Sequence, residues 1–209
     1  MSGDVHVRIR ERLGVKFPRA TRRNVYVRSQ QAGERVLRTL KSLYAKLHLR
    51  VNEDKTEVGS VFGRKFLGYC LRRSSGDTVK IAVAPKALDS FRQRIRLITS
   101  RAGGRSMTQV AEKLREYVPG WKAYFRLAQT PWTLRMLEQW LRRRLRALQL
   151  RHWRTGPATY RGLRRLGATQ ELALKVAAAA GRWWRCSLSD VHHVLNVAHF
   201  DRLGVPRLT

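Results

Sequence analysis

Arginine and aromatic residues are concentrated in residues 130–167, and no acidic residue lies between Glu138 and Glu171. A guanidinium group forks onto phosphate oxygens and stacks on planar rings, so this composition suits a polyanion that carries bases. A solvated helix face is the ordinary explanation of a charge run, but it normally mixes both signs. We therefore predict nucleic-acid contacts through these arginines: Arg142, Arg143, Arg144, Arg146, Arg151, Arg154, Arg161, Arg164 and Arg165.

Three aromatic residues accompany this basic stretch: Trp121, Tyr124 and Trp153. Large rings at helical spacing serve two purposes in proteins, because they fill cores and also provide flat faces for bases. The sequence leaves both roles open for each of the three.

Groups suited to catalysis or metal binding are sparse. The 14 acidic residues are scattered, and no close pair is present that could hold two magnesium ions. His192, His193 and His199 lie near Asn196, but without a second cluster of ligands they fit ordinary packing better than a metal site. The sequence thus predicts no catalytic residue and no metal ligand.

The glycine pair at residues 103–104 stands between Arg101 and Arg105. Backbone N–H groups of such a loop can cradle a phosphate. A linker that simply ends a helix fits the same residues, and both interpretations remain open.

Composition also indicates a polyanionic partner. Lys and Arg total 44 against 14 Asp and Glu, which gives a net charge of +30, while 43% of residues are hydrophobic and can build a core. Self-repulsion of this size opposes compactness unless a polyanion screens it. Nucleic acid is the leading candidate and an anionic membrane surface the second; no apolar run approaches the length of a transmembrane helix. Cys70 and Cys186, without a CxxC motif, are expected to be free thiols.

The elements that must position these residues are strands first and helices afterwards, which predicts the α+β class. We expect extended segments at VHVRI and residues 24–27, a helix over residues 32–48, and a hairpin of strands 65–71 and 79–83 joined by a turn at residues 74–77. Gly68, inside the first hairpin strand, indicates either a bulge or close backbone approach, or simple core packing.

Helical periodicity takes over after Ala84, where we place a domain boundary. Expected helices cover residues 87–101, 107–125, 130–155, 158–166 and 169–180. Ser106 and Thr130 are predicted capping residues, and Pro119 should kink the second helix or split it in two. The tail, rich in Trp, His and Phe, is predicted to form an ordered cap. The expected domains are 1–84, 85–185 and 186–209.

The stretch LRVNEDKTEVGSVFGRKFLGYCL resembles the last two palm blocks of reverse transcriptases encoded by bacterial group II introns. That family has an N-x-x-K-[ST] turn, matched here by Asn52, Lys55 and Thr56, and then F-L-G-[YF], matched by Phe66, Leu67, Gly68 and Tyr69. The next segment, IAVAPKALDSFRQRIRLIT, is similar to the start of the family's thumb. LREYVPGWKAYFRLAQTPWTLRMLEQWLRRRLRALQLRHWR is similar to its maturase region, domain X, and AHFDRLGVPRL to its C-terminal ending. The resemblance covers about residues 24–209.

The resemblance implies a palm remnant followed by a helical thumb and maturase domain that binds intron RNA and helps it fold for splicing, in the bacterial cytoplasm and without a membrane partner. It places Lys55 near the phosphates of an incoming nucleotide, and Asn52 in the same turn. Phe66, Leu67, Gly68 and Tyr69 would form the hairpin on the primer side.

The sequence departs from the family at the catalytic motif. Ala20, Thr21, Arg22 and Arg23 stand where Tyr-Ala-Asp-Asp should precede the strand, and the fingers and first palm blocks are missing. We therefore expect no polymerisation by this chain alone and no cofactor; Mg²⁺ belongs to an intact reverse transcriptase. An alternative is the C-terminal part of a polymerase that is active only with a separately encoded N-terminal half. A third hypothesis is a decayed product whose palm cannot fold.

Overall fold

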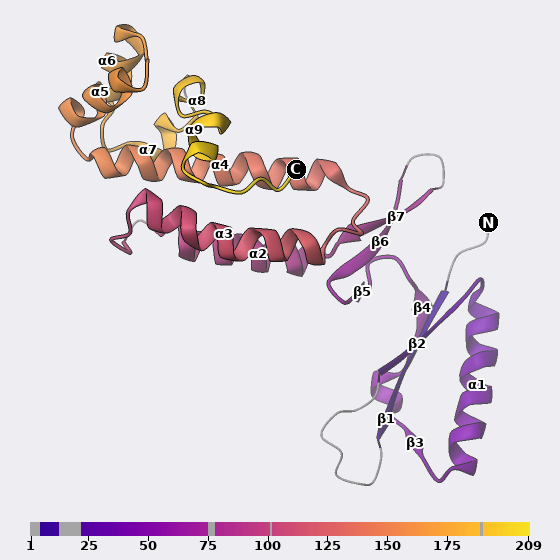
Figure 1. The fold of residues 1–209 in the computed structure, drawn as a ribbon. Helices are drawn as coiled ribbons and strands as arrows, with labels where there is room; N and C mark the ends of the chain where they lie inside the picture. Colours follow the sequence, from indigo (N-terminus) through magenta and orange to yellow (C-terminus); the bar gives the residue numbers. More distant parts are fainter. Residues whose placement is uncertain (1–4, 13–21, 75–77, 101, 189) are drawn as a thin grey trace. The chain divides into compact units, whose positions relative to one another are not determined.

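A computed structural model describes residues 5–12, 22–74, 78–100, 102–188 and 190–209. Its contacts divide the chain into two compact units, residues 1–80 and 81–209. The expected α+β class is confirmed, with strands confined to the first part and helices dominating the second (Figure 1). Two sequence-based expectations lie outside the described residues. They are residues 75–77 of the turn expected at 74–77, and the segment that contains Ala20 and Thr21.

The first unit is a sheet with one helix against it. Strand β1 (Val5–Arg12) pairs antiparallel with β2 (Arg22–Val27), and along its length also with β4 (Glu57–Ser60) and β3 (Arg50–Val51). Helix α1 (Gln30–Lys46) is capped by Ser29, whose hydroxyl accepts from Ala32 N. Its buried Tyr44 packs among apolar side chains of the strands and the helix: Val25, Val27, Leu37, Leu40, Leu49, Val51 and Val58.

The expected single strand at residues 65–71 is wrong. The chain instead forms β5 (Lys65–Phe66) and β6 (Tyr69–Arg73), which pair antiparallel with Phe66 opposite Tyr69. Leu67 and Gly68 make the two-residue turn with φ of 48° and 80°. Two positive φ values are the geometry of a type I′ hairpin turn, and glycine adopts them without steric cost. Gly68 therefore makes a turn rather than a bulge inside a strand.

Strand β7 (Val79–Val83) lies next to β6 and completes a three-stranded sheet, as expected for the predicted hairpin. Helix α2 (Pro85–Ile98) begins directly after it, with proline in the first turn, where its missing N–H costs nothing. Helix α3 (Met107–Tyr124) begins at Ser106 in a capping box. The Ser106 hydroxyl accepts from Gln109 N, and the Gln109 side chain accepts from Ser106 N.

Helix α3 runs through Pro119 without a break, so the expected division into two helices is wrong. Proline removes one backbone donor, but here it sits on the exposed face. The opposite face is continuous across it, because Leu114 and Val118 are fully buried and Trp121 packs on Phe91 with ring centroids 4.5 Å apart. Packing on both sides of the proline offsets the lost hydrogen bond.

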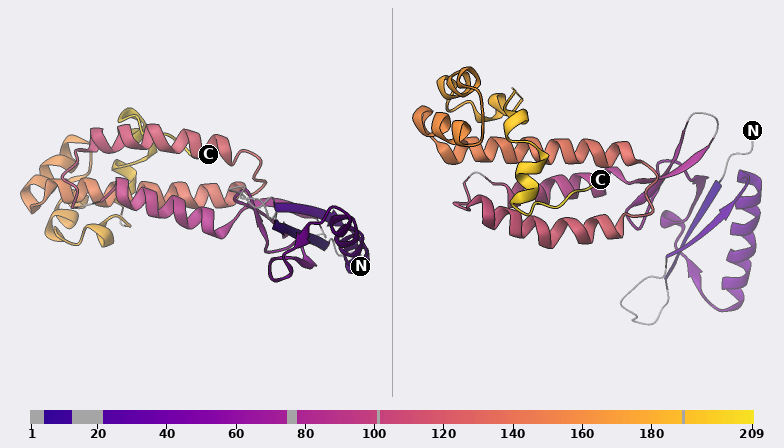
Figure 2. Two further views of the ribbon diagram at one scale, coloured as in Figure 1. Left: turned by 90° about the horizontal axis from the view of Figure 1, so that it is seen from below. Right: turned by 45° about the horizontal axis from the view of Figure 1, so that its top comes forward.

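Helix α4 (Pro131–Trp153) starts and ends close to where the sequence predicts. The capping role expected for Thr130 is not observed: its side chain makes no cap hydrogen bond, since Thr130 has φ −122° and ψ 68° rather than the usual extended cap geometry. Figures 1 and 2 show α2, α3 and α4 lying side by side. Their inner faces build one core, with Phe91, Ile95, Leu114, Leu141 and Leu145 fully buried.

The remaining chain covers α4. Helices α5 (Gly156–Arg165) and α6 (Gln170–Ala178) pack on each other beyond its C-terminal end. The short helices α7 (Trp183–Cys186), α8 (Val191–Val194) and α9 (Val197–Arg202) then lead back along it. Leu195, Phe200 and Leu208 are fully buried in the core, so the predicted ordered cap is confirmed. Within the described ranges no helix combines the length and apolar character needed to cross a bilayer.

Candidate nucleic-acid interface

Helix α5 carries a face of exposed arginines. Thr155 caps the helix by accepting from Ala158 N, and Thr159 and Leu163 form its buried side. Residues spaced by three and four share a helix face. Arg161, Arg164 and Arg165 therefore point together to the outside, and all three are exposed. We call these three residues the α5 arginine face.

Charge on the α5 arginine face is not balanced locally. Arg164 donates to the carbonyl of Ala168 at 2.6 Å, a neutral partner. Arg154 is exposed at the end of α4, where it adopts a positive φ of 57°. Four cations thus lie within twelve residues that contain no carboxylate. A surface of this kind attracts an anion with several charges rather than a single small one.

Arg142, the first arginine of the predicted set, is buried rather than exposed to a partner. It is only 3% exposed, and its guanidinium donates to Glu138 Oε1 at 2.9 Å and to Asp201 Oδ1 at 3.2 Å. The expected phosphate contact of Arg142 is therefore wrong. The cause is α-helical spacing: Glu138 and Arg142 stand four residues apart beside the buried leucines, and the tail covers both.

The other α4 arginines of the predicted set are half-buried and hold neighbouring elements. Arg144 Nε donates to Thr99 Oγ1 at 2.8 Å at the end of α2, and Arg146 Nε donates to Ser187 O at 3.1 Å beyond α7. Burial lowers the pKa of Arg146, and the like charges of Arg143 and Arg142 lower it further. These cations repel one another, so a bound polyanion would also reduce the repulsion between them.

Two arginine–tryptophan stacks attach α7 to α4. The Arg143 guanidinium carbon lies 3.8 Å from the centroid of the Trp184 ring, and that of Arg151 lies 4.9 Å from the Trp183 ring. Such stacks stabilise by about 0.5–2 kcal/mol. The aromatics paired with the basic helix are thus supplied from within the chain, at positions that the sequence did not single out.

Two of the three predicted aromatic residues fill the core. Trp121 packs between Phe91 and Phe125, at 4.5 and 4.6 Å between ring centroids. The Trp153 ring lies against Gly162, where a Cβ atom would meet a ring carbon at 2.4 Å. Tyr124 is different, because more than half of its side chain is exposed.

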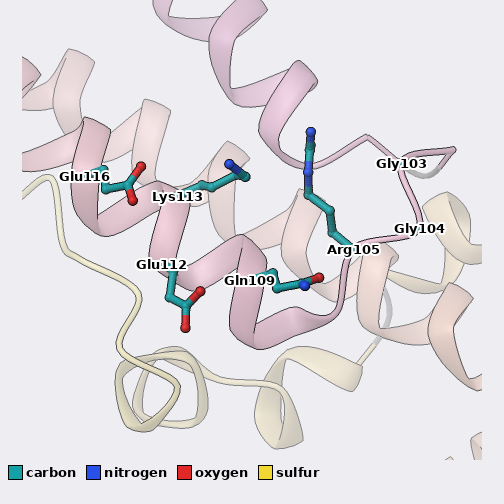
Figure 3. A pocket seen from close by; sticks show the side chains of 7 residues that line it. All are labelled: Gly103, Gly104, Arg105, Gln109, Glu112, Lys113 and Glu116. Atoms are coloured by element: carbon teal, nitrogen blue, oxygen red, sulfur yellow. The ribbon is translucent and has the colours of Figure 1, made fainter.

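The glycine pair before α3 borders an open hollow of about 490 Å³ (Figure 3). Arg105 turns toward the end of α2, where its Nη1 donates to the carbonyls of Leu97 and Ile98 at 2.9 and 3.3 Å. Glu112 and Glu116 line the same hollow. The two carboxylates would repel a phosphate, and Arg105 is already bonded to the end of α2. The hollow is therefore unsuited to phosphate, and the glycine pair is better explained as a linker that ends α2. Arg101 lies outside the described residues.

The histidines are distributed rather than convergent. The ring centroids of His192 and His193 lie 4.0 Å apart with the rings tilted by 38°, while His199 contacts Phe200 edge-on at 5.1 Å between centroids. Burial lowers the pKa of His199, and Arg202 nearby lowers it further. Across the part of the chain that the structure describes, no three His, Cys, Asp or Glu side chains come together as a metal site.

The palm-type residues lie on two separate turns of the chain. Asn52 precedes the short 3₁₀ helix η1 (Glu53–Lys55), in which Lys55 is exposed. Phe66 and Leu67 are exposed at the tip of the β5–β6 hairpin. Lys55, Phe66 and Leu67 are accessible to a partner, whereas Asn52 is half-buried.

The residues that sequence reasoning missed are Glu138, Asp201 and Arg207. Arg207 pairs with Asp201, and the backbone N–H groups of Leu208 and Thr209 donate to Glu138 Oε2 at 2.6 and 3.2 Å. The Arg207 hydrogen bond is the main cause that lowers the pKa of Asp201. The sequence carried a signal only for the pair of Glu138 and Arg142, since a glutamate and an arginine four residues apart beside the leucine stripe indicate a buried ion pair.

Residues 88–167 match the family model described as the group II intron, maturase-specific domain. The chain contains a maturase-specific domain. The matched segment runs from α2 through α3 and α4 to the end of α5, so it includes the α5 arginine face. A search of curated proteins finds no match. The first unit lies outside the matched segment, and its likeness to a reverse-transcriptase palm rests on the resemblance of its sequence motifs.

Proposed function

We propose that the maturase-specific domain binds structured intron RNA and assists splicing, while the RNA supplies the chemistry. The α5 arginine face is the observation that carries this proposal. It lies within the segment matched to the maturase-specific domain, its three guanidinium groups are exposed, and the sequence has no acidic residue between Glu138 and Glu171. Guanidinium groups bind phosphate through paired N–H donors, which suits a folded RNA backbone.

Salt dependence tests the electrostatic part of the proposal. Each phosphate neutralised contributes a slope of about −0.7 to −0.9 in log K against log salt. Arg154 and the α5 arginine face therefore predict a slope of about −3 to −4, and further contacts from the half-buried α4 arginines would steepen it. Binding of a group II intron RNA should be measured by filter retention across a salt series.

A matched pair of variants assigns the contacts. Replacing Arg161, Arg164 and Arg165 together with glutamine should make the slope shallower by about 2–3. The control removes three exposed cations from α1, by Arg35→Gln, Arg38→Gln and Lys46→Gln, and should change the slope little. Equal effects of both triples would refute a defined interface and leave only general charge attraction. Excision of the intron RNA with and without protein then tests assistance of splicing.

A second candidate function is the C-terminal part of a polymerase that needs a separate N-terminal half. The observation that favours it is the β5–β6 hairpin, which exposes Phe66 and Leu67 at its tip although both are large and apolar. Primer extension by the chain with and without a candidate N-terminal fragment tests it. Product only in the mixture supports this function, and its absence in both assays leaves RNA binding alone.

A further inference from the structure

Large apolar side chains are exposed together around the connection between α3 and α4. The exposed fractions are 55% for Tyr124, 60% for Leu127, 63% for Trp132 and 45% for Met136. Trp132 and Met136 are four residues apart in α4 and so share one face of the helix. Exposure of several large apolar side chains within one short segment indicates a binding surface.

The backbone of this connection is held in place. Gln129 N donates to Ile81 O at 2.7 Å, and Ile81 N donates in return to the Gln129 side-chain oxygen at 3.0 Å. Phe125 anchors the other side, since it is buried and its carbonyl accepts from Ala128 N. The exposed side chains therefore stand on a fixed support, which lowers the entropic cost of binding a partner.

Positively charged residues alternate with the apolar ones along this segment. Lys122, Arg126 and Arg135 are exposed, and the sequence has no acidic residue from 117 to 137. The next carboxylate, Glu138, is buried and bonded to Arg142. These cations argue against a protein partner, because protein interfaces are depleted in lysine at their centres and apolar pockets of a partner would not require the cations. Rings among cations instead match a chain of bases and phosphates.

We propose that this surface, formed by Lys122, Tyr124, Arg126, Leu127, Trp132, Arg135 and Met136, binds unpaired nucleotides of RNA by stacking their bases on Trp132 and Tyr124. Bases within a double helix already stack on each other, so only unpaired ones offer a free face. The inference rests on the proposed function, since it names a second RNA element that the same domain would bind.

The two surfaces lie at opposite ends of α4. A 23-residue helix is about 35 Å long at 1.5 Å per residue. An RNA that occupies both must therefore present unpaired nucleotides about 35 Å from the phosphates bound by the α5 arginine face. This requirement selects a folded RNA with a loop or bulge beside a double helix, rather than a uniform duplex.

The test compares a single-stranded pyrimidine oligonucleotide of about ten residues with a perfect RNA duplex, by fluorescence anisotropy. Trp132→Ala should weaken single-strand binding by about 5- to 150-fold, the equivalent of one stacked base, and leave duplex binding unchanged. Trp132→Phe keeps a ring and should bind nearly as the wild type does. Trp132→Leu keeps apolar area without a ring and should bind as weakly as the alanine variant. Leu174→Ala is the control without effect, since Leu174 on α6 is 53% exposed against 63% for Trp132.

The outcomes separate the two proposals. Unchanged single-strand binding by Trp132→Ala overturns the stacking surface and leaves the proposed function intact if duplex binding still depends on the α5 arginine face. Full binding by Trp132→Leu also overturns it, because the surface would then act by apolar contact, as for a protein partner. If the wild type binds neither RNA, both proposals fail. Thermal unfolding of each variant verifies that the exposed substitution leaves the fold intact.

Discussion

Replacement of Arg142 by methionine should strongly destabilise the helical unit. Arg142 is 3% exposed and donates to Glu138 and Asp201, so Arg142→Met leaves two carboxylates without their shared cation at nearly unchanged side-chain volume. Removing one partner of a buried ion pair costs about 3–5 kcal/mol. Asp201 keeps Arg207, and Glu138 keeps two backbone donors, so we expect the lower end, about 3 kcal/mol.

Thermal unfolding followed by circular dichroism measures the effect. For a chain of this length, about 2–4 °C of Tm is lost per kcal/mol, so Tm should fall by about 6–12 °C. Arg135→Met, an exposed position on the same helix, is the control and should change stability by less than about 0.5 kcal/mol. The double variant Glu138→Gln/Arg142→Met should regain part of the loss, because the buried carboxylate is gone while the amide oxygen can still accept from Leu208.

Two results would refute this reasoning. If Arg142→Met and Arg135→Met lower Tm equally, the buried ion cluster does not hold the tail on α4. If the single variants add without coupling in the double variant, Glu138 and Arg142 do not interact in the folded protein. Limited proteolysis adds a local readout, since cleavage should begin in the tail of Arg142→Met and not in the control.

Four further substitutions test backbone space and pH. Gly162→Ala should destabilise by about 1–3 kcal/mol because its Cβ would press on the Trp153 ring, whereas Gly120→Ala, which meets no atom within 4 Å, should stabilise α3 by about 0.5–1 kcal/mol in the same denaturant titration. Gly68→Ala should weaken the β5–β6 hairpin by about 1 kcal/mol because its φ is 80°, as faster hydrogen exchange there would reveal. Burial lowers the pKa of His199, so the unfolded chain binds its proton at higher pH than the folded chain does. Stability should therefore fall as pH drops below about 6.5, and replacement of His199 by glutamine should flatten this part of the pH curve.

Helical periodicity and capping chemistry were sufficient to predict most of the helical unit. The stripe from Met107 to Phe125, the Ser106 cap and the proline start of α4 are local signals, and the structure follows them except at the Thr130 cap. The continuity of α3 through Pro119 could not be predicted, because it depends on burial against Phe91 from another helix. Local sequence shows the cost of a proline but not the packing that offsets it.

The basic stretch shows a similar limit. Sequence counts every arginine equally, whereas the fold buries Arg142 and leaves Arg161, Arg164 and Arg165 exposed. The difference depends on Asp201, which lies 59 residues after Arg142 in the chain. The strand pattern missed the β5–β6 turn for another reason, although the family resemblance had placed residues 66–69 in a hairpin: Leu67 occupies a left-handed conformation that its residue type does not favour. A single glycine at position 68 was not enough to predict a turn formed by Leu67 and Gly68 together.

The hydrogen bonds from Leu208 and Thr209 to Glu138 span 70 and 71 residues, and this separation has a consequence for synthesis on the ribosome. When α4 first leaves the exit tunnel, Arg142 has Glu138 nearby but neither Asp201 nor the backbone donors that complete the cluster. Helices can form at once, yet the cluster cannot close until residues 201–209 have emerged. A nascent chain stalled before residue 200 should therefore present the open flank of α4 to chaperones and proteases.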